Sequence, residues 1–195
     1  MSPKINKSQR YLLLDTNIIS RFSNENFGEK VIAILREAAG YGYGVAISDL
    51  TYFELLNEAS PETEVKMVSV LNGITRFYVK KDILIAAGHL GSFYKEHRLP
   101  PDQFDQGDKI IAATAILHNC VVFTLNGRDF PQPFFKEIDR RMLDYQSREY
   151  PVCVPAYFLE PQLEYTSRYH QKRIEPYAKV GKVTVAPKLK NEKDK

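Results

Sequence analysis

The sequence predicts an α/β fold, a three-layer α/β/α sandwich around a central parallel sheet of about five strands. Short apolar runs alternate along the chain with longer stretches of helical periodicity. This alternation is typical of a parallel sheet that helices cover on both faces. The 195 residues, 44% of them hydrophobic and 26% charged, are enough for one domain with a sizeable core.

The first half of the chain alternates between the two kinds of element. The run 11–14 predicts a buried strand because it is apolar until it meets Asp15. Gly40 ends a helical stretch, and Ser48 or Asp49 supplies the N-cap of the next helix. The elements expected here are a strand at 11–14, a helix at 29–39, a strand at 45–47, helices at 50–57 and 64–73, and a strand or loop at 77–79.

The second half contains the most apolar helix of the chain. Residues 110–117 are apolar on nearly every face, so the helix that contains them must be buried inside the fold. Pro100 and Pro101 end the helix before it. The elements expected here are helices at 82–97 and 104–119, a strand at 121–124 and a last strand within 152–159.

Charge divides the chain into three parts. Residues 1–10 form a basic N-terminal arm, residues 11–159 form the compact and net acidic domain, and residues 160–195 form a basic, tyrosine-containing extension. We expect 188–195 to be disordered because this end is rich in charge and poor in apolar residues. The mixture of tyrosines and cations over 165–179 suits either contact with RNA or a solvated helix.

Composition also indicates the cellular compartment of the protein. The first ten residues lack the apolar segment of a secretory signal, and no stretch is long and apolar enough for a membrane helix. The two cysteines, Cys120 and Cys153, are too few for a disulfide framework and have no metal-ligand spacing. We therefore expect a cytoplasmic protein that does not associate with a membrane.

Polar side chains with oxygen atoms follow the predicted strands. In open α/β sheets, ligands bind at the carboxyl ends of the strands. Asp15 follows the first strand directly, and Asn126 and Asp129 follow the strand at 121–124. Glu54 lies in a helix whose apolar surface extends most of the way round, and Asp108 opens the buried helix. These positions predict a cluster of oxygen ligands at one edge of the sheet.

Such a cluster suits one kind of metal. Carboxylates that converge without nitrogen or sulfur ligands favour a hard divalent cation, Mg²⁺ or Mn²⁺, which serves phosphoryl chemistry. Taken singly, two of the acids have simpler explanations. Asp108 suits the positive N-terminal end of its helix, and Glu54 suits pairing with a nearby lysine or arginine.

Four segments with acidic residues follow one another along the chain: LLLDTNII at 12–19, ISDLTYFELL at 47–56, DKIIAATA at 108–115 and TLNGRDF at 124–130. In this order they resemble the motifs of PIN-domain ribonucleases. Their order and gaps are most similar to the VapC-type toxins of type II toxin–antitoxin pairs. The resemblance covers residues 11–159 and implies a PIN-like fold for this part of the chain.

The resemblance also implies an activity. Asp15, Glu54 and Asp108 would be the core metal ligands and would act in catalysis together with Asp129. The fourth metal position falls on Asn126 or Asp129, because the family often has an acid where this chain has Asn126. The implied activity is that of a Mg²⁺-dependent endoribonuclease, with Mn²⁺ as a substitute, which hydrolyses RNA with an activated water. The implied partners are RNA, a cognate antitoxin protein and a second copy of the chain.

Substrate contacts are expected beside the acids. Thr16 and Asn17 match a polar pair of the family that would hold water or phosphate. An acidic site also needs cations that admit a polyanion, and the nearest basic residues in sequence are, in order of preference, Arg128, Lys109 and Arg21. For a homodimer, the apolar positions that the sequence offers are Met67, Val70 and Leu71, or Leu84, Ile85 and Leu90.

Two other functions fit the same motifs. The chain could be a PIN-domain nuclease of RNA processing that is not a toxin. It could also be a PIN-like module that binds RNA or protein without cleavage, since Asn126 carries no charge at the fourth position.

Overall fold

A computed structural model describes residues 9–22, 24–97, 99, 105–146 and 150–167. The remaining residues include most of the N-terminal arm, the segment 168–195 and therefore most of the tyrosine-containing stretch 165–179. The expectations about these segments lie outside the described residues. Within the described residues, no helix is long and apolar enough to cross a membrane.

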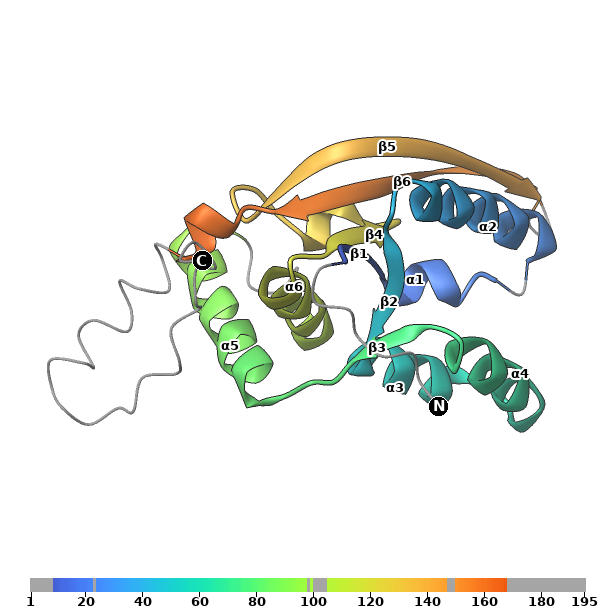
Figure 1. Cartoon of the computed structure of the whole chain (residues 1–195), viewed down its shortest axis with the longest axis horizontal. Coiled ribbons are helices and arrows are strands. Elements are labelled where there is room, and N and C mark those ends of the chain that lie inside the picture. The colour runs from blue at the N-terminus through green and yellow to red at the C-terminus, as the bar shows by residue number, and fades with distance from the viewer. Residues whose placement is uncertain (1–8, 23, 98, 100–104, 147–149, 168–195) are drawn as a thin grey trace, which may run out of the picture.

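The centre of the fold is a six-stranded mixed sheet in the order β3-β2-β1-β4-β6-β5 (Figure 1). Neighbours among the first four strands pair in parallel, whereas β6 runs antiparallel to both β4 and β5. The strands are β1 (Tyr11–Leu14), β2 (Gly44–Ser48), β3 (Thr75–Phe77), β4 (Val121–Thr124), β5 (Phe135–Gln146) and β6 (Pro151–Pro161).

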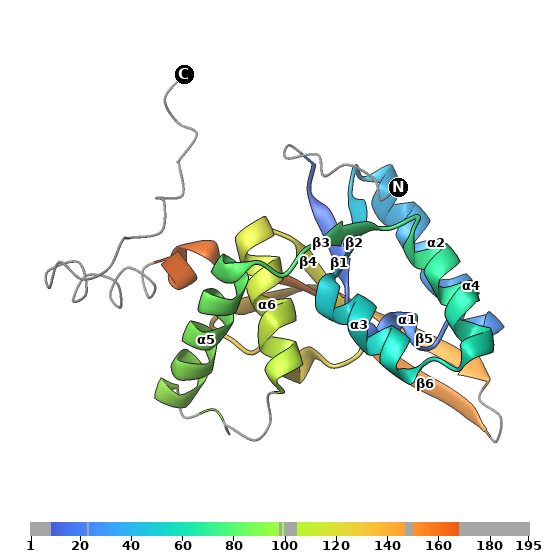
Figure 2. The same ribbon diagram turned by 90° about the horizontal axis from the view of Figure 1, so that it is seen from below.

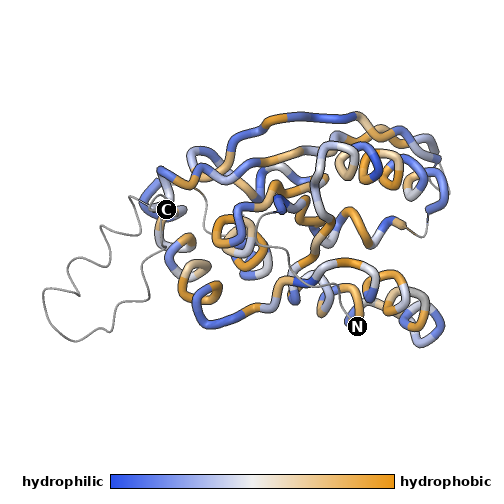
Figure 3. The backbone as a smooth tube through the Cα atoms, viewed as in Figure 1, coloured by the Kyte–Doolittle hydropathy of each residue, from blue (hydrophilic) through white to orange (hydrophobic). Residues whose placement is uncertain are grey.

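Helices cover both faces of this sheet. One hydrophobic core lies between the sheet and the helices α5 and α6, and the other lies between the sheet and α1 and α2. Figure 3 shows apolar residues concentrated in the central strands. The helices are α1 (Thr16–Ile19), α2 (Glu25–Gly40), α3 (Asp49–Glu58), α4 (Pro61–Leu71), α5 (Lys81–Glu96), α6 (Gln106–His118) and the 3-10 turn η2 (Gly127–Asp129).

The helices α3 and α4 lie toward the β3 edge of the sheet (Figure 2). They contribute Leu55 and Leu71 to the core that α1 and α2 share. Leu90 of α5 belongs to the other core. Leu71 and Leu90 are therefore unavailable for a dimer interface, whereas Val70, Leu84 and Ile85 are exposed.

The predicted α/β sandwich is confirmed, and its sheet differs from the expectation in two respects. It has six strands rather than about five, and the hairpin of β5 and β6 makes it mixed rather than wholly parallel. The sequence gives little sign of β5 because residues 136–142 are exposed on both faces of an edge strand and lack an apolar alternation. A register shift between Glu137 and Asp139 interrupts the pairing further.

Element boundaries agree well for the buried strands. Both β1 and β4 coincide with the predicted 11–14 and 121–124. The segment predicted as a strand or loop at 77–79 is a strand, but it occupies Thr75–Phe77. Helix α2 begins four residues before the predicted start because the side chain of Asn24 accepts a hydrogen bond from the backbone N–H of Phe27.

The connection from α6 to β4 depends on a left-handed residue. Asn119 ends α6 with a φ of 50°, and the chain enters β4 two residues later. Alanine in this conformation is strained by about 1 kcal/mol or more, whereas glycine is not. We expect Asn119→Ala to lower the free energy of unfolding by about that amount and Asn119→Gly to leave it nearly unchanged, as measured by urea denaturation. Equal losses for both variants would contradict this explanation.

Candidate active site

Four acidic side chains from four elements lie near one another at the carboxyl edge of the parallel strands. Asp15 follows β1, Glu54 lies in α3, Asp108 lies in the first turn of α6, and Asp129 lies in η2 after β4. The negative charges of Asp15 and Glu54 both raise the pKa of Asp108, and those of Asp108 and Asp15 raise the pKa of Asp129. The structure thus brings together all four acids that the sequence singled out.

Asp15 is the most firmly held of the four. Its side chain accepts hydrogen bonds from the Thr16 backbone at 2.8 Å, the Asn17 amide at 2.7 Å and the Thr124 hydroxyl at 2.6 Å. Burial raises its pKa, and these three hydrogen bonds oppose that rise. The carboxylate is buried, and its oxygen atoms have fixed directions.

Asn17 and Thr124 tie the ends of β1 and β4 together. The Asn17 amide donates to Asp15 and also to Thr124 at 3.1 Å, while its side-chain oxygen accepts from the Leu125 backbone at 3.0 Å. The Thr124 hydroxyl in turn accepts from the Asn126 backbone at 2.9 Å. In the structure the amide nitrogen and the oxygen of Asn17 both have partners within the protein, and its role in holding water or phosphate stays a prediction.

Glu54 is positioned by Thr16 and by a close approach of two helices. The Thr16 hydroxyl donates a hydrogen bond to Glu54. A Cβ atom at Gly107 would lie 2.7 Å from Glu54 Oε1, so only glycine at this position lets α6 come so near the carboxylate. An ion pair between Glu54 and a lysine or arginine, which the sequence also suits, stays a prediction.

Asp108 has two roles in the structure. Its Oδ2 accepts a hydrogen bond from the Asp105 backbone at 3.0 Å, which completes a capping box at the start of α6. Burial and the charges of Asp15, Asp105 and Glu54 nevertheless raise its pKa to about 6. Asp108 thus lies in the first turn of its helix, as its simpler explanation requires, and the same side chain also belongs to the acidic cluster.

Asp129 and Asn126 act as a pair. The Asn126 amide donates to Asp129 Oδ2 at 2.7 Å, and Asn126 itself is exposed while Asp129 is buried. Burial, with the charges of Asp108 and Asp15, raises the pKa of Asp129 to about 7. This geometry favours Asp129 as the fourth acidic group and Asn126 as the residue that orients it.

The three basic candidates differ in their surroundings. Arg21 donates to the hydroxyl of Tyr145 at 2.8 Å, and the side-chain carbons of Lys109 face Gly91 of α5. Arg128 is exposed in η2, next to Asp129, and forms no ion pair with the part of the chain that the structure describes. Arg128 is therefore the best placed of the three to meet a phosphate.

The structure places two further residues at the site, Tyr94 and Gly107, that the sequence analysis did not include. Tyr94 of α5 is buried, and the nearby charges of Asp108 and Asp129 help burial to raise its pKa. Its position in an amphipathic helix resembles that of any core tyrosine. Gly107 did carry a signal, because glycine in the first turn of a helix beside a candidate ligand suggests a close approach.

The donor set fits a hard divalent cation in its chemistry. All four acidic groups supply oxygen ligands, and they are partly or fully buried next to one another, which a cation would offset. Among the described residues, no three acidic, histidine or cysteine side chains are close enough to hold one ion as they stand.

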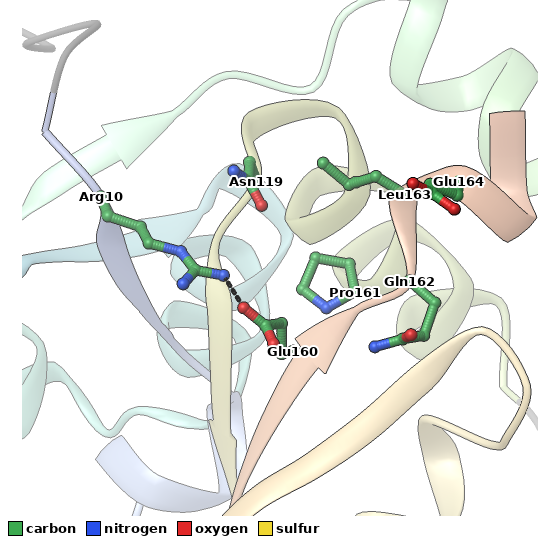
Figure 4. Close-up of a pocket in the computed structure, with 7 residues that line it drawn as sticks. All are labelled: Arg10, Asn119, Glu160, Pro161, Gln162, Leu163 and Glu164. Atoms are coloured by element: carbon green, nitrogen blue, oxygen red, sulfur yellow. Dashed lines mark hydrogen bonds and ion pairs between the residues drawn. The ribbon is translucent and has the colours of Figure 1, made fainter.

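A cavity lies away from the acids. It has a volume of about 440 Å³ and is lined by residues that flank the amino ends of β1 and β4, including Arg10, Asn119 and Glu160 (Figure 4). The ion pair between Arg10 and Glu160 crosses it. This cavity is at the opposite edge of the sheet from the acids, so we do not assign it to their chemistry.

The raised pKa of Asp129 predicts how stability depends on pH. Its folded-state pKa of about 7 exceeds the unfolded value of about 3.9, so this group's contribution to stability is greatest at low pH and is lost as pH rises through 7. We expect Asp129→Asn to raise the melting temperature by roughly 2–4 °C at about pH 8 and by little at about pH 4. Calorimetry at both pH values checks this, with the exposed Asp82→Asn as control. The same gain at both would contradict it.

Two solved structures resemble this chain. The first is a toxin–antitoxin complex from Klebsiella pneumoniae, with 26% identity, coverage of 63% of this chain and 92% of that chain, and a TM-score of 0.46. The second is a DNA-bound VapBC from Salmonella typhimurium, with 24% identity, coverage of 62% of this chain and 90% of that chain, and a TM-score of 0.50. The second likeness supports the fold alone.

A family comparison identifies the fold more firmly. No curated protein matches this chain significantly. The model of the PIN domain matches residues 12–136, which is more than half of the chain and includes all four acids. The motif order, the α/β sandwich and the acidic edge agree with this match, and the chain belongs to the PIN-domain family.

Proposed function

We propose that this chain is a divalent-metal-dependent endoribonuclease and the toxin of a toxin–antitoxin pair. The observation that carries the proposal is the meeting of Asp15, Glu54, Asp108 and Asp129 at one edge of the sheet in a PIN domain. Four carboxylates that are close together and partly buried lower the stability of the fold. Sites of this kind are commonly functional.

The four acids would hold Mg²⁺ or Mn²⁺. When bound, the metal would neutralise charge on the phosphodiester oxygens and lower the pKa of the attacking water. Thr16, Asn17 and Thr124 keep the oxygens of Glu54 and Asp15 in fixed directions, which limits the reorganisation that binding requires. Arg128 would bind an RNA phosphate beside Asp129.

The toxin role has weaker support than the nuclease role. It rests on the resemblance of the four motifs to VapC-type toxins and on the fold shared with the Salmonella VapBC structure. An antitoxin would then be the partner that covers the acidic edge. Val70, Leu84 and Ile85, which are exposed, would be the positions for contact with a second copy of the chain.

A binding module without catalysis is the second candidate. It is favoured by Asn126, whose neutral amide adds no charge at the fourth position and donates to Asp129. Such a module would bind RNA equally well with and without the charge of Asp15. The experiment below distinguishes the two functions.

Removing one carboxylate should abolish cleavage. We expect Asp15→Asn to reduce the rate of RNA hydrolysis in Mg²⁺ or Mn²⁺ by more than about 100-fold, because the metal loses its most firmly held ligand. The measurement is cleavage of a mixed RNA pool, with an EDTA control and with circular dichroism to check the fold.

The matched control is Asp82→Asn, which neutralises an exposed acid at the far end of α5 and should cleave normally. Cleavage that survives EDTA or Asp15→Asn would contradict the metal-nuclease proposal. If the wild type cleaves nothing, calorimetry with Mn²⁺ decides: no heat of binding would favour the module without catalysis.

Gly107 should affect metal binding through the position of Glu54. A Cβ atom at this position would meet the end of a flexible side chain, so we expect Gly107→Ala to leave the protein folded and to displace Glu54. Mn²⁺ affinity should then fall by about tenfold or more, as measured by calorimetry. The control is Gly88→Ala in α5, where a Cβ atom meets nothing within 4 Å; it should bind Mn²⁺ normally. Unchanged affinity in Gly107→Ala would remove Glu54 from the ligand set.

A further inference from the structure

The hairpin of β5 and β6 extends past the carboxyl edge of the parallel strands. Thr124, the last residue of β4, pairs with Tyr157, so the first six residues of β6 and their partners in β5 continue beyond it. Figure 2 shows these strands projecting on the side where α1 and α3 leave the sheet. The hairpin therefore stands beside the acidic site, and nearly all of it lies outside the residues 12–136 that match the family model.

One face of the hairpin is anchored. Leu143, Ala156 and Phe158 lie in the core shared with α1 and α2. Near the tip, the Tyr145 ring packs edge-on against Phe27 with 5.2 Å between centroids, and the Asn24 amide donates to the Gln146 carbonyl at 2.7 Å. These contacts hold the projecting strands in place against α2 and the core.

The opposite face of the hairpin is open to solvent and begins at η2, which contains Asp129. Gly127 of η2 packs under the ring of Tyr157, since a Cβ atom there would lie 3.1 Å from the ring. The guanidinium of Arg140 lies over the same ring at 4.9 Å from its centroid. Arg140, Tyr157 and Gly127 thus form a stack that leads to Arg128 and Asp129, and we call it the Arg140–Tyr157 stack.

Arg140 is held in place over this ring by Glu137. Its Nε and Nη2 donate to the two carboxylate oxygens of Glu137 at 2.9 and 2.8 Å. The bidentate pair fixes the plane of the guanidinium and neutralises its charge, while 53% of the side chain remains exposed. Such a plane is better suited to stack on a flat, uncharged ring than to clamp a phosphate.

We propose that the Arg140–Tyr157 stack is a platform for one nucleobase of single-stranded RNA, with Arg128 on the adjoining phosphate. The inference rests on the proposed nuclease function. Proteins recognise single-stranded RNA by stacking its bases on aromatic rings and on arginine planes, and phosphates need a cation without a competing acid. Arg140 meets the first requirement, and Arg128 meets the second.

The chain offers a matched pair for the test. Arg140 and Arg141 are neighbours on β5 that point to opposite faces, and Arg141 pairs instead with Asp139 and with Glu37 of α2. Each is changed to lysine, which keeps the charge and removes the plane. Binding of a labelled single-stranded RNA of about 12 nucleotides is measured in the non-cleaving Asp15→Asn background with Mg²⁺ present. Glu54→Gln is the background if Asp15→Asn does not fold.

We expect Arg140→Lys to raise Kd by about tenfold and Arg141→Lys by less than about twofold. Equal Kd values for the two variants would overturn the platform. So would a change in oligomeric state in Arg140→Lys alone, which would make this face a contact between copies of the chain. If the background variant binds no RNA and the wild type cleaves none, the proposed function fails together with this inference. If the wild type cleaves RNA and the two variants bind alike, the platform alone fails.

Discussion

The buried carboxylate of Asp15 is the interaction on which the site depends. It lies between the ends of two neighbouring strands, and its partners Asn17 and Thr124 also bond to each other and to the backbone after β4. These bonds set the direction in which the chain leaves β4 and thereby the position of η2 with Asp129. One acid thus organises a neighbouring acid that is more than a hundred residues away in the sequence.

The acidic side chains at this edge lower the stability of the fold. Burial and mutual repulsion raise the pKa values of Asp108 and Asp129 to about 6 and 7, so near neutral pH the folded state holds charges that water would solvate better. The polar neighbours offset only part of this cost. The Asn126 amide and the Asp105 backbone each favour an ionised carboxylate, but burial has the larger effect on both groups.

The sequence was most informative where an acidic residue directly follows a short apolar run. Acids after apolar strands predicted the site, and β1 and β4 were predicted to the residue because they are short, apolar and buried. The directions of the side chains could not be predicted from the sequence. Neither the hydrogen bond from Thr16 to Glu54 nor that from Asn17 to Thr124 follows from the local sequence pattern. Tyr94 had no distinguishing signal, and β5 was missed because an edge strand exposed on both faces lacks the alternation that marks strands.

The same exposed strand has a consequence for assembly in the cell. A 12-residue strand at the rim of a sheet offers unpaired backbone groups to any other extended chain, which is the usual beginning of fibrous aggregation. Here a register shift between Glu137 and Asp139 makes that rim irregular, and the charged pairs of Arg140 and Arg141 lie along it. The hairpin can therefore remain long and solvent-facing while resisting self-templated polymerisation.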